Sequence, residues 1–173
     1  MAIKGILFDN QAPTAKGLRG GFNSALTDGI LCGCATETSG YNFVIKSGLM
    51  NVAGGIFAVT GDTNVTVAYD ADKPYARVKA NIDLSQTATT EAFNQVSFTV
   101  DYASSVNTFT NLVQENINYG SGTIYQAEMF ILLLNNTGIS SIVRTATASA
   151  KMQYGNTLPS DAPEGTIFLL KVN

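Results

Sequence analysis

The best candidates for catalytic or metal-binding residues in this sequence are the acidic residues of one turn-rich stretch. Asp70 and Asp72 lie two positions apart, and Asp62 and Asn64 precede them. Paired carboxylates can perform glycoside hydrolysis, and carboxylate and amide oxygens are the usual ligands of calcium. The spacing matches no EF-hand loop, and no neighbouring apolar pocket is indicated that would raise a carboxyl pKa. Solvated turn acids are therefore the favoured interpretation, with weak calcium binding and hydrolysis as alternatives. A hydrolase would lose its activity on Asp70→Asn or Glu128→Gln.

Histidine is absent from all 173 residues. This absence excludes Ser-His and Cys-His nucleophile pairs, imidazole metal ligands and the usual zinc sites. The only cysteines, Cys32 and Cys34, lack further metal ligands nearby, and their spacing is near the limit for a disulfide in a strand. We interpret them as two small buried thiols in a protein made in a reducing cytosol. The glycines between Gly17 and Gly21 do not form a phosphate-binding loop, because the required Lys and Ser/Thr are missing.

Sugar-binding sites usually present an exposed aromatic ring, and the sequence has no Trp. Four tyrosines fall within predicted strands, where core packing is the default: Tyr41, Tyr69, Tyr102 and Tyr125. Three others lie in or near turns and are the candidates for exposure: Tyr75, Tyr119 and Tyr154. An ordinary surface tyrosine remains the favoured interpretation of each. We assign no catalytic, cofactor-binding or metal-binding residue.

The charge content narrows the range of partners. Only 13% of residues are charged, with 10 Lys and Arg against 13 Asp and Glu, and they form no basic stripe. Nucleic acid and anionic membrane are therefore poor partners. The longest apolar run, residues 129–134, is far shorter than the ~20 residues that span a bilayer. The opening stretch is also too short for the core of a signal peptide.

Most of the chain has the patterns of β-strands. Residues 76–84 alternate at period two, which predicts one face in the core and one in water, the latter with Arg77, Lys79, Asn81 and Asp83. Residues 123–134 become apolar on both faces beyond Met129, as in a strand covered on both sides. Further strands are predicted at residues 41–46, 55–60, 64–69, 95–102 and 166–172. Turn signals separate these strands, so the fold class is all-β, an antiparallel β-sandwich.

One segment has the helical period. Leu18, Phe22 and Leu26 recur every four residues, which predicts a short helix near residues 16–26. Residues 103–118 carry few signals and are expected to form a long connection. Residues 155–165 are rich in Pro and Gly and read as a linker. We expect one sandwich domain over residues 1–150, with residues 151–173 forming a linker and a final strand that packs on the same domain.

Several stretches, in matching order, resemble the N-terminal shoulder domain of receptor-binding proteins from lactococcal siphophages. The most specific is Ala-Asn-Ile-Asp-Leu-Ser-Gln-Thr-Ala at residues 80–88. The stretches are residues 3–8, 53–57 with 61–62, 79–88, 117–123 and 138–143. Asp-Gly-Ile-Leu at residues 28–31, with Gly33-Cys34, also resembles small tail-module proteins of siphophages that infect Gram-positive bacteria. One of these is a stand-alone shoulder-like domain of a Bacillus siphophage. The resemblance covers about residues 1–150.

The resemblance implies a β-sandwich with a short helix and a non-enzymatic, virion-associated role. In the lactococcal proteins the shoulder anchors a receptor-binding trimer in the baseplate, and a neck and a saccharide-binding head follow. The present sequence ends at Asn173 and leaves no room for either. We therefore expect a tail-tip or baseplate component, made in the cytoplasm of the bacterial host, that docks other tail or adsorption proteins as a monomer or weak trimer. The alternative is a module for host attachment that binds cell-wall saccharide directly.

Overall fold

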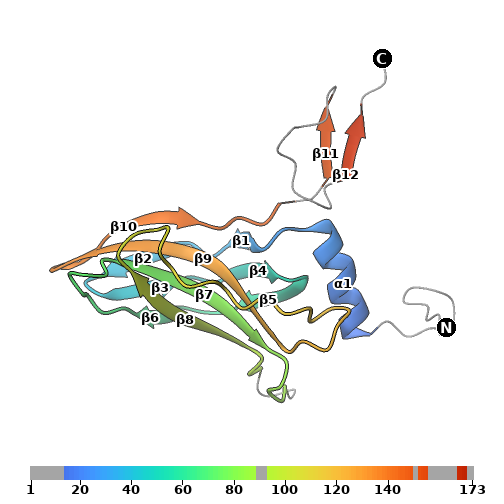
Figure 1. Cartoon of the computed structure of the whole chain (residues 1–173), viewed down its shortest axis with the longest axis horizontal. Helices are drawn as coiled ribbons and strands as arrows, with labels where there is room; N and C mark the ends of the chain where they lie inside the picture. Colours follow the sequence, from blue (N-terminus) through green and yellow to red (C-terminus); the bar gives the residue numbers. More distant parts are fainter. Residues whose placement is uncertain (1–13, 89–92, 150–151, 156–166, 171–173) are drawn as a thin grey trace, which may run out of the picture.

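The computed structural model describes residues 14–88, 93–149, 152–155 and 167–170. The fold is all-β with one short helix, as the sequence predicts (Figure 1). In chain order the elements are α1 (Ala15–Ala25), β1 (Gly29–Gly33), β2 (Thr36–Ser39), β3 (Asn42–Ile45), β4 (Gly48–Val52), β5 (Gly55–Val59), β6 (Thr63–Thr66), β7 (Tyr75–Asp83), β8 (Val96–Ala103), β9 (Ile124–Asn135), β10 (Gly138–Thr145), β11 (Met152–Gly155) and β12 (Ile167–Leu170).

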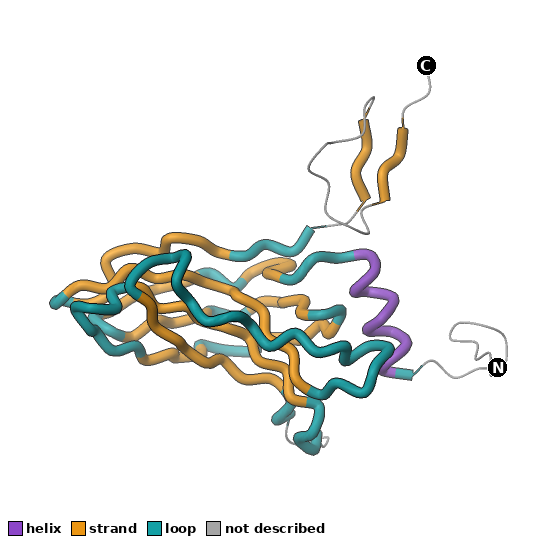
Figure 2. Tube along the Cα trace, viewed as in Figure 1, coloured by secondary structure: helices purple, strands orange, loops and turns teal. Residues whose placement is uncertain are grey.

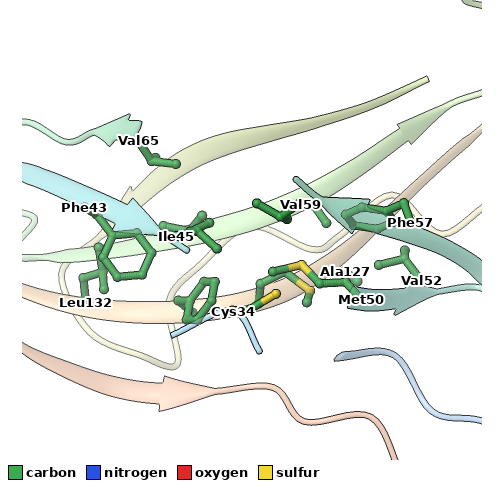
Figure 3. Close-up of a cluster of buried hydrophobic side chains, with 14 of the residues drawn as sticks. Cys34, Phe43, Ile45, Met50, Val52, Phe57, Val59, Val65, Ala127 and Leu132 are labelled. Carbon is green, nitrogen blue, oxygen red and sulfur yellow. The ribbon is translucent and has the colours of Figure 1, made fainter. Parts of the chain in front are cut away.

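Three antiparallel sheets surround the core in a sandwich-like arrangement. The largest has the order β10-β9-β7-β8, and the two smaller ones have the orders β1-β4-β5 and β2-β3-β6. Inward side chains from all three sheets form one buried cluster (Figure 3). At its centre the rings of Phe43 and Phe130 meet edge to face, with centroids 4.9 Å apart. β11 and β12 pair with each other in parallel.

The outer face of β7 is not open to water, which corrects the prediction for its polar side. Arg77 is only 5% exposed, and Lys79, Asn81 and Asp83 are half-buried. The long connection between β8 and β9 lies across this face (Figure 2), where Arg77 donates to the carbonyl of Thr110. Alternation therefore predicts the strand correctly, but a loop covers the side that was expected to be solvated.

β9 lies inside the largest sheet, and its middle is covered on both faces. Four consecutive side chains, those of Met129 to Leu132, are essentially inaccessible to solvent. A bulge opposite Val78 and Lys79 of β7 shifts the register there. The prediction of a doubly covered strand is confirmed for this part of β9.

α1 begins at an N-cap and packs beside β5. The Thr14 hydroxyl accepts a hydrogen bond from the Gly17 N–H at 3.1 Å, which satisfies one of the free donors of the first turn. The helix ends at Ala25, so the predicted helix near residues 16–26 is confirmed. Among the residues described, no helix is long and apolar enough to cross a membrane.

Gly21→Ala should stabilise the protein by about 0.5–1 kcal/mol, because alanine loses less backbone entropy in a helix. A Cβ added at Gly21 meets nothing within 4 Å. Gly20→Ala is the matched control in the same helix, since its Cβ would press on the Tyr119 hydroxyl. Urea unfolding of the two variants should show a larger gain for Gly21→Ala than for Gly20→Ala, because the Tyr119 side chain must move to admit a Cβ at Gly20. Equal gains would mean that Tyr119 does not restrict this helix.

Candidate functional site

The acidic residues of the turn-rich stretch do not form one site, and two of them, Asp62 and Asp70, have partners within the protein. Asp62 pairs with the Lys46 ammonium at 2.7 Å, and Glu37 pairs with the same group at 2.8 Å. Hydrogen bonds from Lys46 to Asp62 and then Glu37 raise the pKa of Lys46. Asp70 instead caps its own turn, accepting from the Asp72 N–H at 2.9 Å. Within the described ranges, no three acidic or cysteine side chains come together as a metal site would require.

The two cysteines occupy different environments. Cys34 is buried in the core (Figure 3), but Cys32 is exposed, so the prediction of two buried thiols is wrong for Cys32. Cys32 lies in β1, which ends at Gly33, and Cys34 follows with a positive φ of 54°. The two cysteines therefore do not lie in the same strand. Burial, together with the nearby Cys32, raises the pKa of the Cys34 thiol. Cys34 is therefore a poor nucleophile at neutral pH.

Three of the tyrosines in or beside strands bind neighbouring polar groups. Tyr41 donates to the Asn135 carbonyl at 2.9 Å, and the Tyr102 hydroxyl accepts from the Ala68 N–H at 2.9 Å. Tyr125 donates to Asp28 at 3.0 Å, and burial followed by the Asp28 charge raises its pKa. Tyr69 is 39% exposed, because β6 ends before it, which corrects the expectation of core packing.

Among the three turn tyrosines, Tyr119 is exposed. Its side chain is 65% accessible, so this prediction is confirmed, whereas Tyr75 is half-buried in β7. The side chain of Tyr154 lies outside the described residues. Tyr119 borders a hollow of about 270 Å³ that Asn118 and Tyr125 also line. Asn118 is 5% exposed, and its Oδ1 has no hydrogen-bond partner in the described part of the chain.

A polar network that the sequence did not reveal holds the turn between β4 and β5. The Asp28 carboxylate accepts from the Ala53 N–H at 2.6 Å, and Asn118 donates to the Ala53 carbonyl at 2.8 Å. Ala53 and Gly54 both have positive φ, of 46° and 77°, as a two-residue hairpin turn requires. This turn packs closely on α1, with Gly54 against the backbone of Arg19. The network therefore fixes where α1 lies relative to β5.

An apolar groove opens where α1, β5 and the start of β8 meet. It has a volume of about 340 Å³. Its walls include Leu18 and Phe22 on one face of α1, Ile56 on β5 and Phe93 just before β8. These four side chains are 39%, 43%, 43% and 58% exposed, respectively. Contiguous apolar surface of this kind marks interaction sites more often than scattered exposed residues do.

Arg19 adds a charge to the same groove. Its Nε is buried and has no hydrogen-bond partner among the residues described. Burial lowers the pKa of Arg19, and no carboxylate of the described residues forms an ion pair with it. A buried donor without an acceptor costs about 1–3 kcal/mol. The groove therefore combines apolar walls with a guanidinium group whose charge is not neutralised by a described carboxylate.

The pattern of Leu18 and Phe22 is the only sequence signal that pointed to this groove. It predicted the helix and placed both side chains on one face, where core packing is the default expectation. Ile56 and Phe93 join them only through the tertiary fold. The search of protein-family models found no match to this chain. The search of curated proteins also found no significant relative.

Proposed function

We propose that this chain is a non-enzymatic structural protein of a bacteriophage tail, a tail-tip or baseplate component of the virion that docks other tail or adsorption proteins. The resemblance of about residues 1–150 to the siphophage shoulder domain supports this proposal. The all-β fold with one short helix agrees with the architecture that the resemblance implies.

The observation that carries the docking role is the apolar groove beside α1. Leu18, Phe22, Ile56 and Phe93 present large side chains to solvent from three different parts of the chain. Burying such surface contributes roughly 25 cal/mol per Å². A partner that covers the four side chains therefore gains binding energy at a place already shaped by the fold.

A second candidate function, direct binding of host cell-wall saccharide, is favoured by the hollow beside Tyr119. The ring of Tyr119 is exposed and borders this hollow, which is the kind of surface on which a sugar ring can stack. The two functions use different surfaces, so different variants separate them.

Phe22→Asp and Ile56→Asp should each lower incorporation of the purified chain into tails assembled without it by more than about tenfold, because each places a charge in an apolar interface. Val143→Asp is the matched control, since Val143 is similarly exposed at 47% but lies on β10, away from the groove. Quantitative immunoblotting of purified tails gives the readout.

Incorporation of both groove variants at the level of the control would contradict docking through this groove. The same proteins should be incubated with isolated host cell walls. Docking predicts that none of them sediments with the walls. Tight sedimentation of the natural chain that Tyr119→Ala abolishes would instead support the saccharide-binding function.

A further inference from the structure

We propose that the groove beside α1 binds the N-terminal segment of a second copy of this chain, residues 3–9, so that copies associate head to tail. The inference rests on the proposed docking function and names one partner for the docking surface. It assigns the apolar walls to Ile6 and Phe8 of the incoming segment, and Arg19 to its Asp9.

The chemistry of this segment matches the groove. Residues 6–9 read Ile-Leu-Phe-Asp, which places a carboxylate directly after three large apolar side chains. The groove offers four exposed apolar side chains and a buried Arg19 Nε without an acceptor. The other stretches outside the described residues, 89–92, 150–151, 156–166 and 171–173, contain no apolar run followed by an acid.

Two strand edges lie beside the groove, where an extended segment could pair. Among the described strands, β5 is at the edge of one sheet and β8 is at the edge of another. The groove is lined by Ile56 and Phe57 of β5 and by Val96 of β8. An unpaired edge can accept the backbone of an added strand. Side chains of an extended segment alternate, so Ile6 and Phe8 face the same way and can enter the groove together. Asp9 follows Phe8 directly, which brings its carboxylate to the same end of the segment as the larger ring.

The point at which the N-terminal segment joins α1 favours binding of a second copy's segment in the groove over binding of the chain's own segment. The groove extends along α1 from Ala15 to Phe22, whereas the segment joins the helix at Thr14, whose backbone is extended at φ −94° and ψ 149°. The chain's own segment would therefore have to turn back alongside the helix before it could enter the groove. The segment of another copy needs no such reversal, and the resulting interface is heterologous.

The test uses three proteins: the full chain, the chain lacking residues 1–9, and the full-length Phe22→Asp/Ile56→Asp variant. Circular dichroism and thermal melting first establish that all three are folded. Sedimentation equilibrium should then show that the full chain self-associates with rising concentration, while neither variant does. The two variants should associate with each other when mixed, because one supplies the groove and the other supplies the segment.

A synthetic peptide of residues 1–11 provides the direct probe. It should bind the chain lacking residues 1–9, and Ile56→Asp in that chain should weaken binding by more than about tenfold. Replacing Asp9 by Arg in the peptide should weaken binding to the natural groove. Arg19→Asp in the protein should restore binding of this altered peptide, which a purely structural effect of Arg19 would not do.

Four results would overturn the proposal. The full chain could stay monomeric at every concentration while the peptide fails to bind. The peptide could bind the shortened chain although the full chain stays monomeric, which would mean that each chain fills its own groove. Association could persist in both variants, which would place the interface elsewhere. The charge exchange between Asp9 and Arg19 could fail to restore binding. None of these results bears on whether the protein belongs to the tail, which labelling of particles tests separately.

Discussion

Arg77→Ala is expected to lower the free energy of unfolding by about 3 kcal/mol, the lower end of the usual effect of removing one partner of a buried ion pair, because Asp101 is partly exposed. The Arg77 guanidinium binds both carboxylate oxygens of Asp101, at 3.1 Å and 2.6 Å. It also donates to the Thr110 carbonyl at 2.6 Å and lies 4.7 Å from the centre of the Phe109 ring. The substitution therefore leaves Asp101 with Lys79, 3.5 Å away, as its ion-pair partner, and it releases the connection that covers β7.

Urea unfolding at neutral pH measures this loss, and Lys73→Ala is the control. Lys73 lies exposed in the turn before β7, so its replacement should change stability by less than about 0.5 kcal/mol. A loss of less than about 1 kcal/mol for Arg77→Ala would mean that the connection is held mainly by other contacts.

The same ion pair predicts how stability depends on pH. Burial raises the pKa of Asp101, but the hydrogen bonds and positive charges of Arg77 and Lys79 outweigh it, and the pKa lies below its ordinary value. A lowered folded-state pKa adds stability above the unfolded-state pKa of about 3.9, and this stability is lost as the pH falls through the folded-state value. The natural protein should therefore lose more stability on acidification than Arg77→Ala does. Identical acid profiles would contradict this role for Asp101.

Gly54→Ala is expected to lower the free energy of unfolding by about 2–5 kcal/mol. Gly54 has a φ of 77°, which costs about 1–2 kcal/mol for a residue with a side chain. The added Cβ would also collide with the carbonyl oxygen of Arg19 and approach the Asn23 nitrogen, both backbone atoms of α1. Overpacking of this kind costs a further ~1–3 kcal/mol. The turn or the helix must move, so the groove beside α1 should change shape as well.

Gly61→Ala is the matched control for Gly54→Ala, because a Cβ at Gly61 meets nothing within 4 Å. Thermal and urea unfolding should show a large loss for Gly54→Ala and less than about 0.5 kcal/mol for Gly61→Ala. The peptide of residues 1–11 should also bind less tightly to Gly54→Ala. Equal stabilities of the two variants would show that α1 is not fixed by this turn.

The period of the apolar residues predicted β7, β8 and α1, because a face that is buried carries an apolar side chain at every second position of a strand or every fourth position of a helix. β9 was predicted instead from its apolar residues on both faces, and β10 was not predicted, although it is as long as β8. β1 and β4 do not, since they are short and carry glycines at their ends, and pairing with neighbouring strands rather than periodicity defines them. Their existence depends on contacts between distant segments, which a local pattern does not contain.

The candidate site was less predictable for the same reason. The spacing of Leu18 and Phe22 predicted an apolar helix face. The sequence pattern does not predict that β5 and β8 leave part of that face uncovered. The burial of Arg77 was missed because the residues that cover it, Phe109 and Thr110, lie in a connection without periodicity. Exposure and burial of single side chains thus followed from the tertiary arrangement, whereas element type followed from the local pattern.

Immunogold labelling of intact particles tests our proposal that this chain is a docking component of a phage tail. Antibodies raised against the purified chain should be applied to particles of the phage that encodes it and viewed by electron microscopy. We expect gold at the tail tip or baseplate, and none on particles assembled without the protein. Intact particles that carry no label, while the infected-cell lysate contains the protein, would contradict it.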